Sequence, residues 1–145
     1  MMSATDLESY LHEKIPLTQA MGVQVAECDD TRLVLTAPLA PNRNHLQTAF
    51  GGSLQTLAIL SGYSLLWRLL DNPDAHIVIR ESTIHYERPV KGELRAVCSA
   101  PSSPEFTRFQ GDFARKGKAR ITLEAVIEED GEVAVRFRGV FVALR

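Results

Sequence analysis

The sequence lacks several features that mark particular classes of protein. Its formal net charge is −2 over 145 residues, so it has no surplus of positive charge with which to hold a nucleic-acid backbone. Only two cysteines are present, Cys28 and Cys98, and they have neither the spacing of a metal site nor that of a redox pair. We therefore expect no bound metal, no nucleic-acid partner, and reduced thiols in a cytoplasmic protein.

Long apolar runs and a leader-like start are also missing. The first residues, MMSATDLESY, have no basic region followed by an apolar one, so export is not expected. Leu57–Leu70 is the most apolar stretch, but polar residues interrupt it and it falls short of the ~20 residues that a membrane span needs. With 45% hydrophobic and 23% charged residues, the composition predicts a single packed domain over residues 1–145.

Two short helices and six strands are predicted from periodicity. The segment TDLESYLHEKIP predicts a helix that opens with a Thr5–Glu8 capping box and ends before Pro16. A second helix is predicted in SPEFTRFQGDFARKG, with Ser103 as its N-cap and Gly117 at its end. The predicted strands are VQVAEC, RLVLTA, HIVIRESTIHYERPV, GELRAVCSA and the two halves of ARITLEAVIEEDGEVAVRFRGVFVAL.

A third helix, from Gly52 to about Leu70, has a different character. It is apolar around most of its circumference and carries one charge, Arg68. One flat neighbour could not cover such a helix, but a curved sheet wrapped around it could. The order of elements therefore predicts an α+β domain, in which one antiparallel sheet of five to six strands encloses a long central helix.

The loop before this helix, NRNHLQTAFGGS, and the later segment ESTIHYERPV together resemble the YiiD C-terminal domain family. Members of that family have the hot-dog fold, are usually described as thioesterases, and include stand-alone malonyl-ACP decarboxylases (ACP, acyl carrier protein). The resemblance covers nearly the whole chain. It implies a hot-dog fold and a thioester substrate of ACP or coenzyme A. It also implies no cofactor beyond the phosphopantetheine that this substrate carries.

The resemblance further implies a homodimer with its active sites at the subunit interface. Hot-dog sheets usually pair edge to edge, and the long third strand, Ile77–Tyr86, is the natural edge for this pairing.

Gly51 and Gly52 fit the glycines at which hot-dog thioesterases bind the thioester carbonyl, and Phe50 stands in place of their histidine. Without a Cβ, the backbone can approach a ligand, and the free N–H groups of the first helical turn face it at the positive end of the helix dipole. Ser53 continues this turn. The alternative is that the two glycines only let the loop pack tightly.

Asn44 lies seven residues before Gly51, the spacing at which a subset of these thioesterases has an asparagine facing the thioester. An amide can orient a carbonyl or carboxylate without titrating. We therefore predict Asn44 and Gly51 as catalytic residues. The predicted substrate-binding residues are Asn42, His45, Phe50, Gly52, Ser53 and Glu81. The alternative for Asn44 is an amide that satisfies its own loop backbone.

The sequence departs from the thioesterase pattern inside the helix. Thioesterases of this kind have an Asp or Glu eight residues after the first glycine, whereas this chain has Ile59, and no carboxylate occurs from Gly51 to Leu70. Hydrolysis needs a group that activates water, typically worth about 10²–10⁴-fold. Decarboxylation needs donors that stabilise an enolate oxygen. The sequence thus favours malonyl-ACP decarboxylation, with thioester hydrolysis as the alternative.

Glu81 complicates this interpretation because it could supply a base from the sheet or from a second subunit. In RESTIHY, Glu81 and His85 share one strand face, whereas Ile84 and Tyr86 share the other and resemble core residues. Glu81 is therefore expected to face outward or into an interface.

A local excess of positive charge runs from residue 108 to residue 120. It could dock an acidic ACP, with help from Arg43, or be a solvated helix face. The residues concerned are Arg108, Arg115, Lys116, Lys118 and Arg120, opposed by Asp112. A dimer that binds acyl thioesters without turnover is a third possibility for the protein as a whole.

Overall fold

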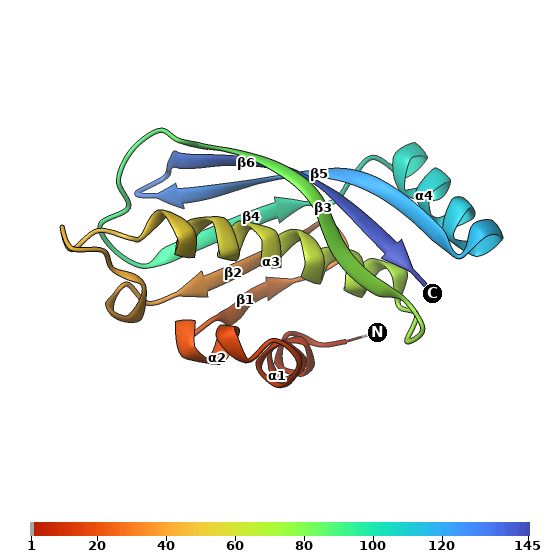
Figure 1. Cartoon of the computed structure of the whole chain (residues 1–145), viewed down its shortest axis with the longest axis horizontal. Helices are drawn as coiled ribbons and strands as arrows, with labels where there is room; N and C mark the ends of the chain where they lie inside the picture. Colours follow the sequence, from red (N-terminus) through yellow and green to blue (C-terminus); the bar gives the residue numbers. More distant parts are fainter. Residues whose placement is uncertain (1) are drawn as a thin grey trace.

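The computed structural model describes residues 2–145, which form four α-helices, one short 3₁₀ turn and six strands (Figure 1). The elements in chain order are α1 Ala4–Lys14, α2 Pro16–Met21, β1 Gln24–Cys28, β2 Arg32–Ala37, the 3₁₀ turn Ala40–Asn42, α3 Gly51–Leu70, β3 His76–Tyr86, β4 Leu94–Ser99, α4 Ser103–Lys116, β5 Lys118–Glu129 and β6 Glu132–Leu144.

One sheet contains all six strands in the order β1-β2-β4-β5-β6-β3, and every neighbouring pair is antiparallel. The sheet curves around α3, which lies along its inner face (Figure 1). Ten of the twenty residues of α3 are buried, as expected for a helix that the sheet encloses. The predicted α+β hot-dog arrangement is confirmed.

Close packing fills the space between α3 and the sheet. A Cβ on Gly62 of α3 would lie 2.5 Å from the ring of Phe141 on β6, so only glycine allows this approach. Helix α1 packs against β1 and contacts α3 through an aromatic ring. Its Leu7 and Leu11 are fully buried, and the ring of Tyr10 stacks on Trp67 with centroids 4.2 Å apart.

The strands alternate between a face toward α3 and an outer face. Leu94, Ala96 and Cys98 of β4 are fully buried on the inner side, as their spacing predicted. Burial raises the pKa of the Cys98 thiol to about 12, consistent with a small core residue. Cys28 is half-buried, and both cysteines are free thiols.

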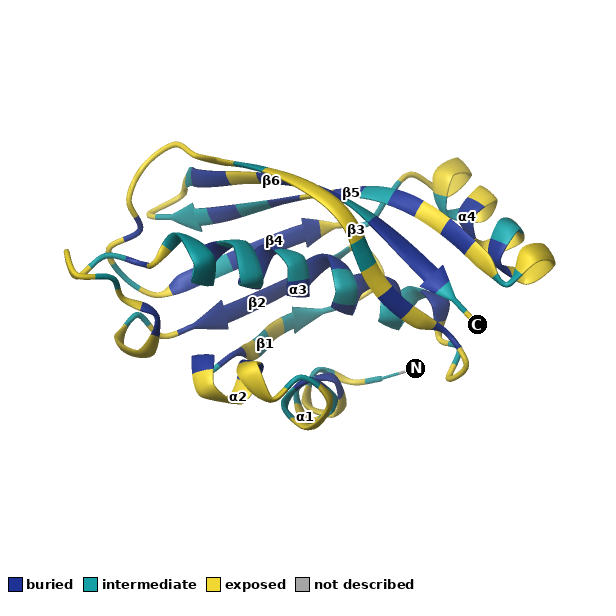
Figure 2. Cartoon of the chain, viewed as in Figure 1, coloured by how far each residue is buried: buried dark blue, intermediate teal, exposed yellow. Residues whose placement is uncertain are grey.

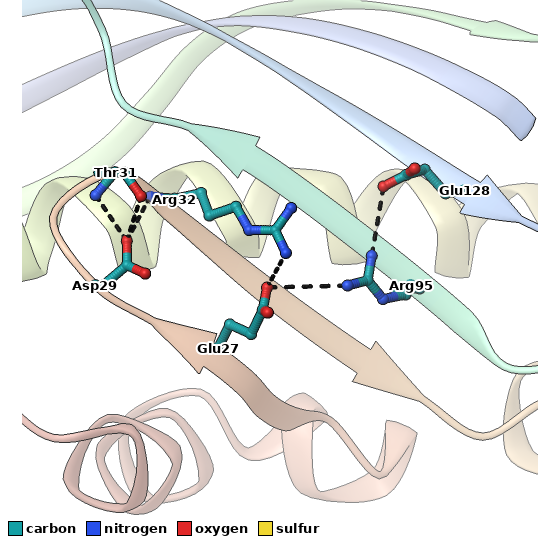
Figure 3. A network of polar contacts seen from close by, with 6 residues as sticks. All are labelled: Glu27, Asp29, Thr31, Arg32, Arg95 and Glu128. Carbon is teal, nitrogen blue, oxygen red and sulfur yellow. Dashed lines mark hydrogen bonds and ion pairs between the residues drawn. The ribbon is translucent and has the colours of Figure 1, made fainter. Parts of the chain in front are cut away.

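Charged side chains cross the outer face from strand to strand (Figure 3). Glu27 of β1 is ion-paired with Arg32 of β2 at 2.5 Å and contacts Arg95 of β4 at 3.9 Å. Arg95 also pairs with Glu128 of β5 at 3.4 Å. This face is therefore a polar surface, with the apolar core on the other side of the sheet.

Several predicted element ends need correction. The Thr5–Glu8 capping box is wrong, because Ser3 caps α1 and forms the box with Asp6. Helix α2 was not predicted. Pro16 has no N–H to continue α1, but it suits the first position of a new helix.

The N-cap of α4 is Ser102 instead of Ser103, a shift of one residue within a Ser-Ser pair. Gly117 ends α4 as predicted, with φ of 69°. The hairpin at Asp130-Gly131 is also confirmed, with φ of 55° and 76° as a two-residue turn between twisted strands requires. Among residues 2–145, no helix has the length and apolarity needed to cross a membrane.

Candidate active site

The first turn of α3 presents backbone N–H groups that have no partner inside the helix. Phe50 is the N-cap residue, and no side chain of residues 2–145 caps this end. The first intrahelical hydrogen bond is donated by Leu54 N–H to Phe50 O, so the N–H groups of Gly51, Gly52 and Ser53 remain for another acceptor. All three residues are partly exposed. This turn therefore suits an oxyanion or carboxylate.

Two aromatic rings flank the glycine pair. A Cβ on Gly52 would overlap the ring of Phe50, and a Cβ on Gly51 would lie 3.5 Å from the ring of Tyr86. The two rings are exposed to 56% and 49%, respectively. Leu46 in the preceding loop is 69% exposed. The glycines thus lie between apolar surfaces that a ligand can contact.

Tyr86 is a residue of this site that sequence reasoning did not assign a role. Its phenol O–H donates to Gly51 O at 3.1 Å from the end of β3. The bond holds the end of a sheet strand against the start of the central helix. The only sequence signal was its place in the segment HYERP, at the end of a predicted strand.

Asn44 is held in a turn by Thr48. Asn44 Oδ1 accepts from Leu46 N–H at 2.8 Å and from Thr48 N–H at 3.2 Å, and Asn44 Nδ2 donates to Thr48 Oγ1 at 2.9 Å. The loop-backbone role considered for Asn44 is therefore present. An amide has two N–H donors, however, and the contact with Thr48 uses one of them. The catalytic role of Asn44 stays a prediction.

Asn42 has the contacts of a loop anchor. It is 2% exposed, and its Nδ2 donates to Met21 O at 2.9 Å and to Pro38 O at 2.8 Å. Its backbone O accepts from Phe50 N–H at 2.7 Å. Asn42 thus ties the end of α2 to the residue just before α3. Its predicted contact with substrate remains untested.

The other predicted residues lie in two separate places, the loop and first turn of α3 and the strand β3. His45 is exposed in the same loop, near Phe50, Gly52 and Ser53 in the sequence. Glu81 does not join them, because it is exposed on the outer face of β3, opposite Val140 of β6. His85 shares that face and is also exposed. The expectation that Glu81 turns outward is confirmed, and within one chain the sheet separates it from the start of α3.

Helix α3 itself offers no general base. Ile59 is partly buried and packs against the core, and no Asp, Glu or His occurs between Gly51 and Leu70. Its one charged residue, Arg68, donates to Met2 O at 2.6 Å and pairs with Asp30 at 3.4 Å, far from the first turn. Among residues 2–145, no cluster of His, Cys, Asp and Glu could hold a metal ion.

The chain matches a known protein family over nearly its whole length. Residues 4–145 match the family described as "Putative thioesterase (yiiD_Cterm)". The chain belongs to this family. The match spans the start of α3, the loop before α3 and the Phe-rich helix α4.

Solved structures of similar proteins agree with this assignment. A protein of unknown function from Chlorobaculum tepidum TLS is 36% identical, with a TM-score of 0.89, and the match covers 98% of this chain and 94% of that one. A protein from Shewanella oneidensis described as a putative thioesterase is 29% identical, with a TM-score of 0.86 and coverages of 98% and 97%. One from Pseudomonas aeruginosa described as a probable thioesterase is 27% identical, with a TM-score of 0.84 and coverages of 99% and 97%.

Proposed function

We propose that this protein is an enzyme that acts on acyl thioesters at the first turn of α3. The uncapped N–H groups of Gly51 and Gly52 are the observation that carries the proposal, because thioester reactions develop negative charge on the carbonyl oxygen. Membership of a family described as thioesterases gives independent support.

The substrate in this proposal is the thioester of a phosphopantetheine arm, carried by ACP or by coenzyme A. The arm brings the reactive sulfur with it, so the proposed reaction uses no separate cofactor. The rings of Phe50 and Tyr86 flank the approach to Gly51 and offer apolar surface to the arm. Asn44 orients the acyl group with the amide N–H that Thr48 does not occupy.

The reaction that the geometry favours is decarboxylation of a malonyl thioester. The bond between the carboxylate carbon and the α-carbon breaks, CO₂ leaves, and the electron pair forms an enolate that a proton from water then converts to an acetyl thioester. The step requires donors at the enolate oxygen and no base on the helix, which matches an α3 with Ile59 in place of a carboxylate.

Thioester hydrolysis is the second candidate, and the family description and the similar proteins favour it directly. It requires a group that activates water. The loop before α3 contains one histidine, His45, whose imidazole is a candidate for this group. Glu81 faces away from α3 within its own chain. A water-activating role for Glu81 would therefore need its carboxylate to reach the site of a second subunit.

We further propose that the protein is a homodimer that pairs through β3. Among the described residues β6 is the one strand that pairs with β3, so the other edge of β3 has no partner strand along its eleven residues. Most of β3 is exposed (Figure 2), including the apolar side chain of Val78 at 47%. Free edges of this length readily pair. Sedimentation should give a dimer at micromolar concentration, and a monomer would contradict this part of the proposal. A cytoplasmic location, which suits two free thiols, belongs to the same proposal.

Product identification tests the proposed function. The purified protein is incubated with malonyl-ACP, malonyl-CoA and a series of saturated acyl thioesters, and intact masses are followed. A malonyl thioester converted to the acetyl thioester without release of free thiol supports decarboxylation. Free thiol from any acyl thioester supports hydrolysis. All substrates unchanged would contradict both reactions and favour binding without turnover.

A further inference from the structure

The outer face of the sheet holds a small basic pocket beside the last turn of α4. Its volume is about 380 Å³. Four basic side chains line it, from three different elements: Arg80 of β3, Lys116 of α4, and Lys118 and Arg120 of β5. Val142 of β6 also lines it, on the strand between β3 and β5.

The positive charges in this pocket are not neutralised by the protein. None of the four basic side chains is hydrogen-bonded or ion-paired to another side chain within residues 2–145. The acidic residue among the lining residues is Asp112, and it is already paired with Arg115. A concave site lined by like charges concentrates the field and attracts a counter-ion.

A β-bulge lies beside Arg80 in β3. Ile79 lies opposite Phe141 and packs toward the core, whereas Glu81 lies opposite Val140 on the outer side. Strict alternation from Ile79 would point Arg80 outward and Glu81 inward. The bulge between Ile79 and Glu81 instead leaves both Arg80 and Glu81 exposed. Bulges commonly re-aim a side chain in this way at functional positions.

Helix stability explains only part of this charge. Lys116 lies in the last turn of α4, where a cation stabilises the helix dipole. Lys118 and Arg120 are strand residues and gain nothing from that dipole. Arg80 comes from the opposite side of β6. A shared ligand accounts for the convergence of all four.

We propose that this pocket binds the diphosphate group of a small molecule, either free pyrophosphate or a nucleoside diphosphate. Two guanidinium forks and two ammonium groups match the charge and the acceptor geometry of adjacent phosphates. A larger groove of about 500 Å³ continues from the pocket and shares Arg80 and Arg120 with it. It adds two arginines and two glutamates, so its balanced charge suits the uncharged nucleoside part.

This inference does not depend on the proposed function. The pocket lies on the outer face of the sheet, whereas α3 lies along the inner face (Figure 1). A lack of thioester turnover would therefore not contradict the diphosphate site. A lack of diphosphate binding would likewise not contradict the proposed function.

Calorimetric titration of the full chain with pyrophosphate, ADP and adenosine tests the proposal. We expect saturable binding of pyrophosphate and ADP, weakened by added salt, and none of adenosine. ADP binding more tightly than pyrophosphate assigns the site to a nucleotide, and the reverse order assigns it to free pyrophosphate. Arg120→Gln should weaken binding about tenfold, because each charge-assisted hydrogen bond lost costs roughly that factor.

Arg136→Gln is the matched control, because Arg136 is an exposed arginine of the same sheet face that is paired with Glu87 outside the pocket. It removes the same charge and should leave binding unchanged. The proposal is overturned by absence of saturable binding, by an Arg120→Gln variant that binds like wild type, or by equal losses in both variants. Melting temperatures of both variants confirm that each is folded.

Discussion

Asn44 and Thr48 are joined by three hydrogen bonds, from Asn44 N–H to Thr48 O at 2.7 Å, from Asn44 Nδ2 to Thr48 Oγ1 at 2.9 Å, and from Thr48 N–H to Asn44 Oδ1 at 3.2 Å. Together they fix both the position and the rotation of the Asn44 amide. The hydroxyl of Thr48 therefore takes up one N–H of the Asn44 amide, and the proposed function assigns the other N–H to the substrate.

Replacing the Thr48 hydroxyl should lower turnover without unfolding the protein. Thr48→Val keeps the shape but removes the acceptor, and we expect kcat to fall about 3–10-fold, the worth of one net hydrogen bond. Thr48→Ser keeps the hydroxyl and should retain wild-type kcat. Steady-state kinetics of both variants test this prediction. A Thr48→Val variant with the kcat of the wild type would show that the Thr48 hydroxyl does not contribute to turnover.

Asn44→Ala should reduce turnover about 10²–10³-fold, as expected for loss of one preorganised donor. Asn44→Asp is the sharper variant. It keeps the oxygen that accepts from Leu46 and Thr48, so the turn stays intact, but it places a negative charge beside a malonate carboxylate. For decarboxylation it should be at least as damaging as Ala. A hydrolase could instead gain a water-activating group, so full activity of Asn44→Asp on malonyl-ACP would contradict decarboxylation.

Asn42 should respond differently from Asn44, although the two residues are only two positions apart. Asn42→Ala leaves the carbonyls of Met21 and Pro38 without their shared donor in a buried place. We expect the free energy of unfolding to fall by about 1–3 kcal/mol. Chemical denaturation of Asn42→Ala and Asn44→Ala side by side measures this difference, and a larger loss in Asn44→Ala would reverse the two assignments.

Acid should weaken the turn between β1 and β2 through Asp29. The Thr31 hydroxyl and the N–H groups of Thr31 and Arg32 donate to its carboxylate and lower its pKa to about 2 (Figure 3). A lowered folded-state pKa stabilises the fold above the ordinary value near 4, and the contribution disappears as the pH falls to about 2. Asp29→Asn should therefore be less stable than wild type at pH 7, and the gap should close between about pH 4 and pH 2. A gap that is constant with pH in thermal melts would show that the carboxylate charge is irrelevant.

Sequence reasoning succeeded where one element carries the signal. The abrupt change from a polar loop to an apolar segment predicted a helix from Gly52, one residue after the observed start of α3. Strand alternation predicted that Glu81 faces away from Ile84 and Tyr86. Both patterns are local, because side-chain direction follows from the period of a helix or strand.

Contacts between distant elements could not be predicted in the same way. The bond between Tyr86 and Gly51 depends on where β3 ends relative to α3, which the register with β6 decides. The Thr48 contact depends on an irregular loop without period. The bulge that leaves both Arg80 and Glu81 exposed left no sign in the sequence of β3. The Tyr86 contact and the bulge require the assembled sheet, and the Thr48 contact requires the folded loop.

The central claim is that the thioester oxygen binds the first turn of α3, and backbone amide resonances test it most directly. The protein is titrated with an acetyl-CoA analogue whose thioester sulfur is replaced by CH₂, which keeps the carbonyl but has neither a thioester bond to hydrolyse nor a carboxylate to lose. In the wild-type protein, the N–H signals of Gly51, Gly52 and Ser53 should shift and saturate together. In the Asn44→Ala variant, the same three signals should saturate only at a higher concentration of the analogue. Saturable binding of the analogue that leaves these three signals unmoved would contradict the account.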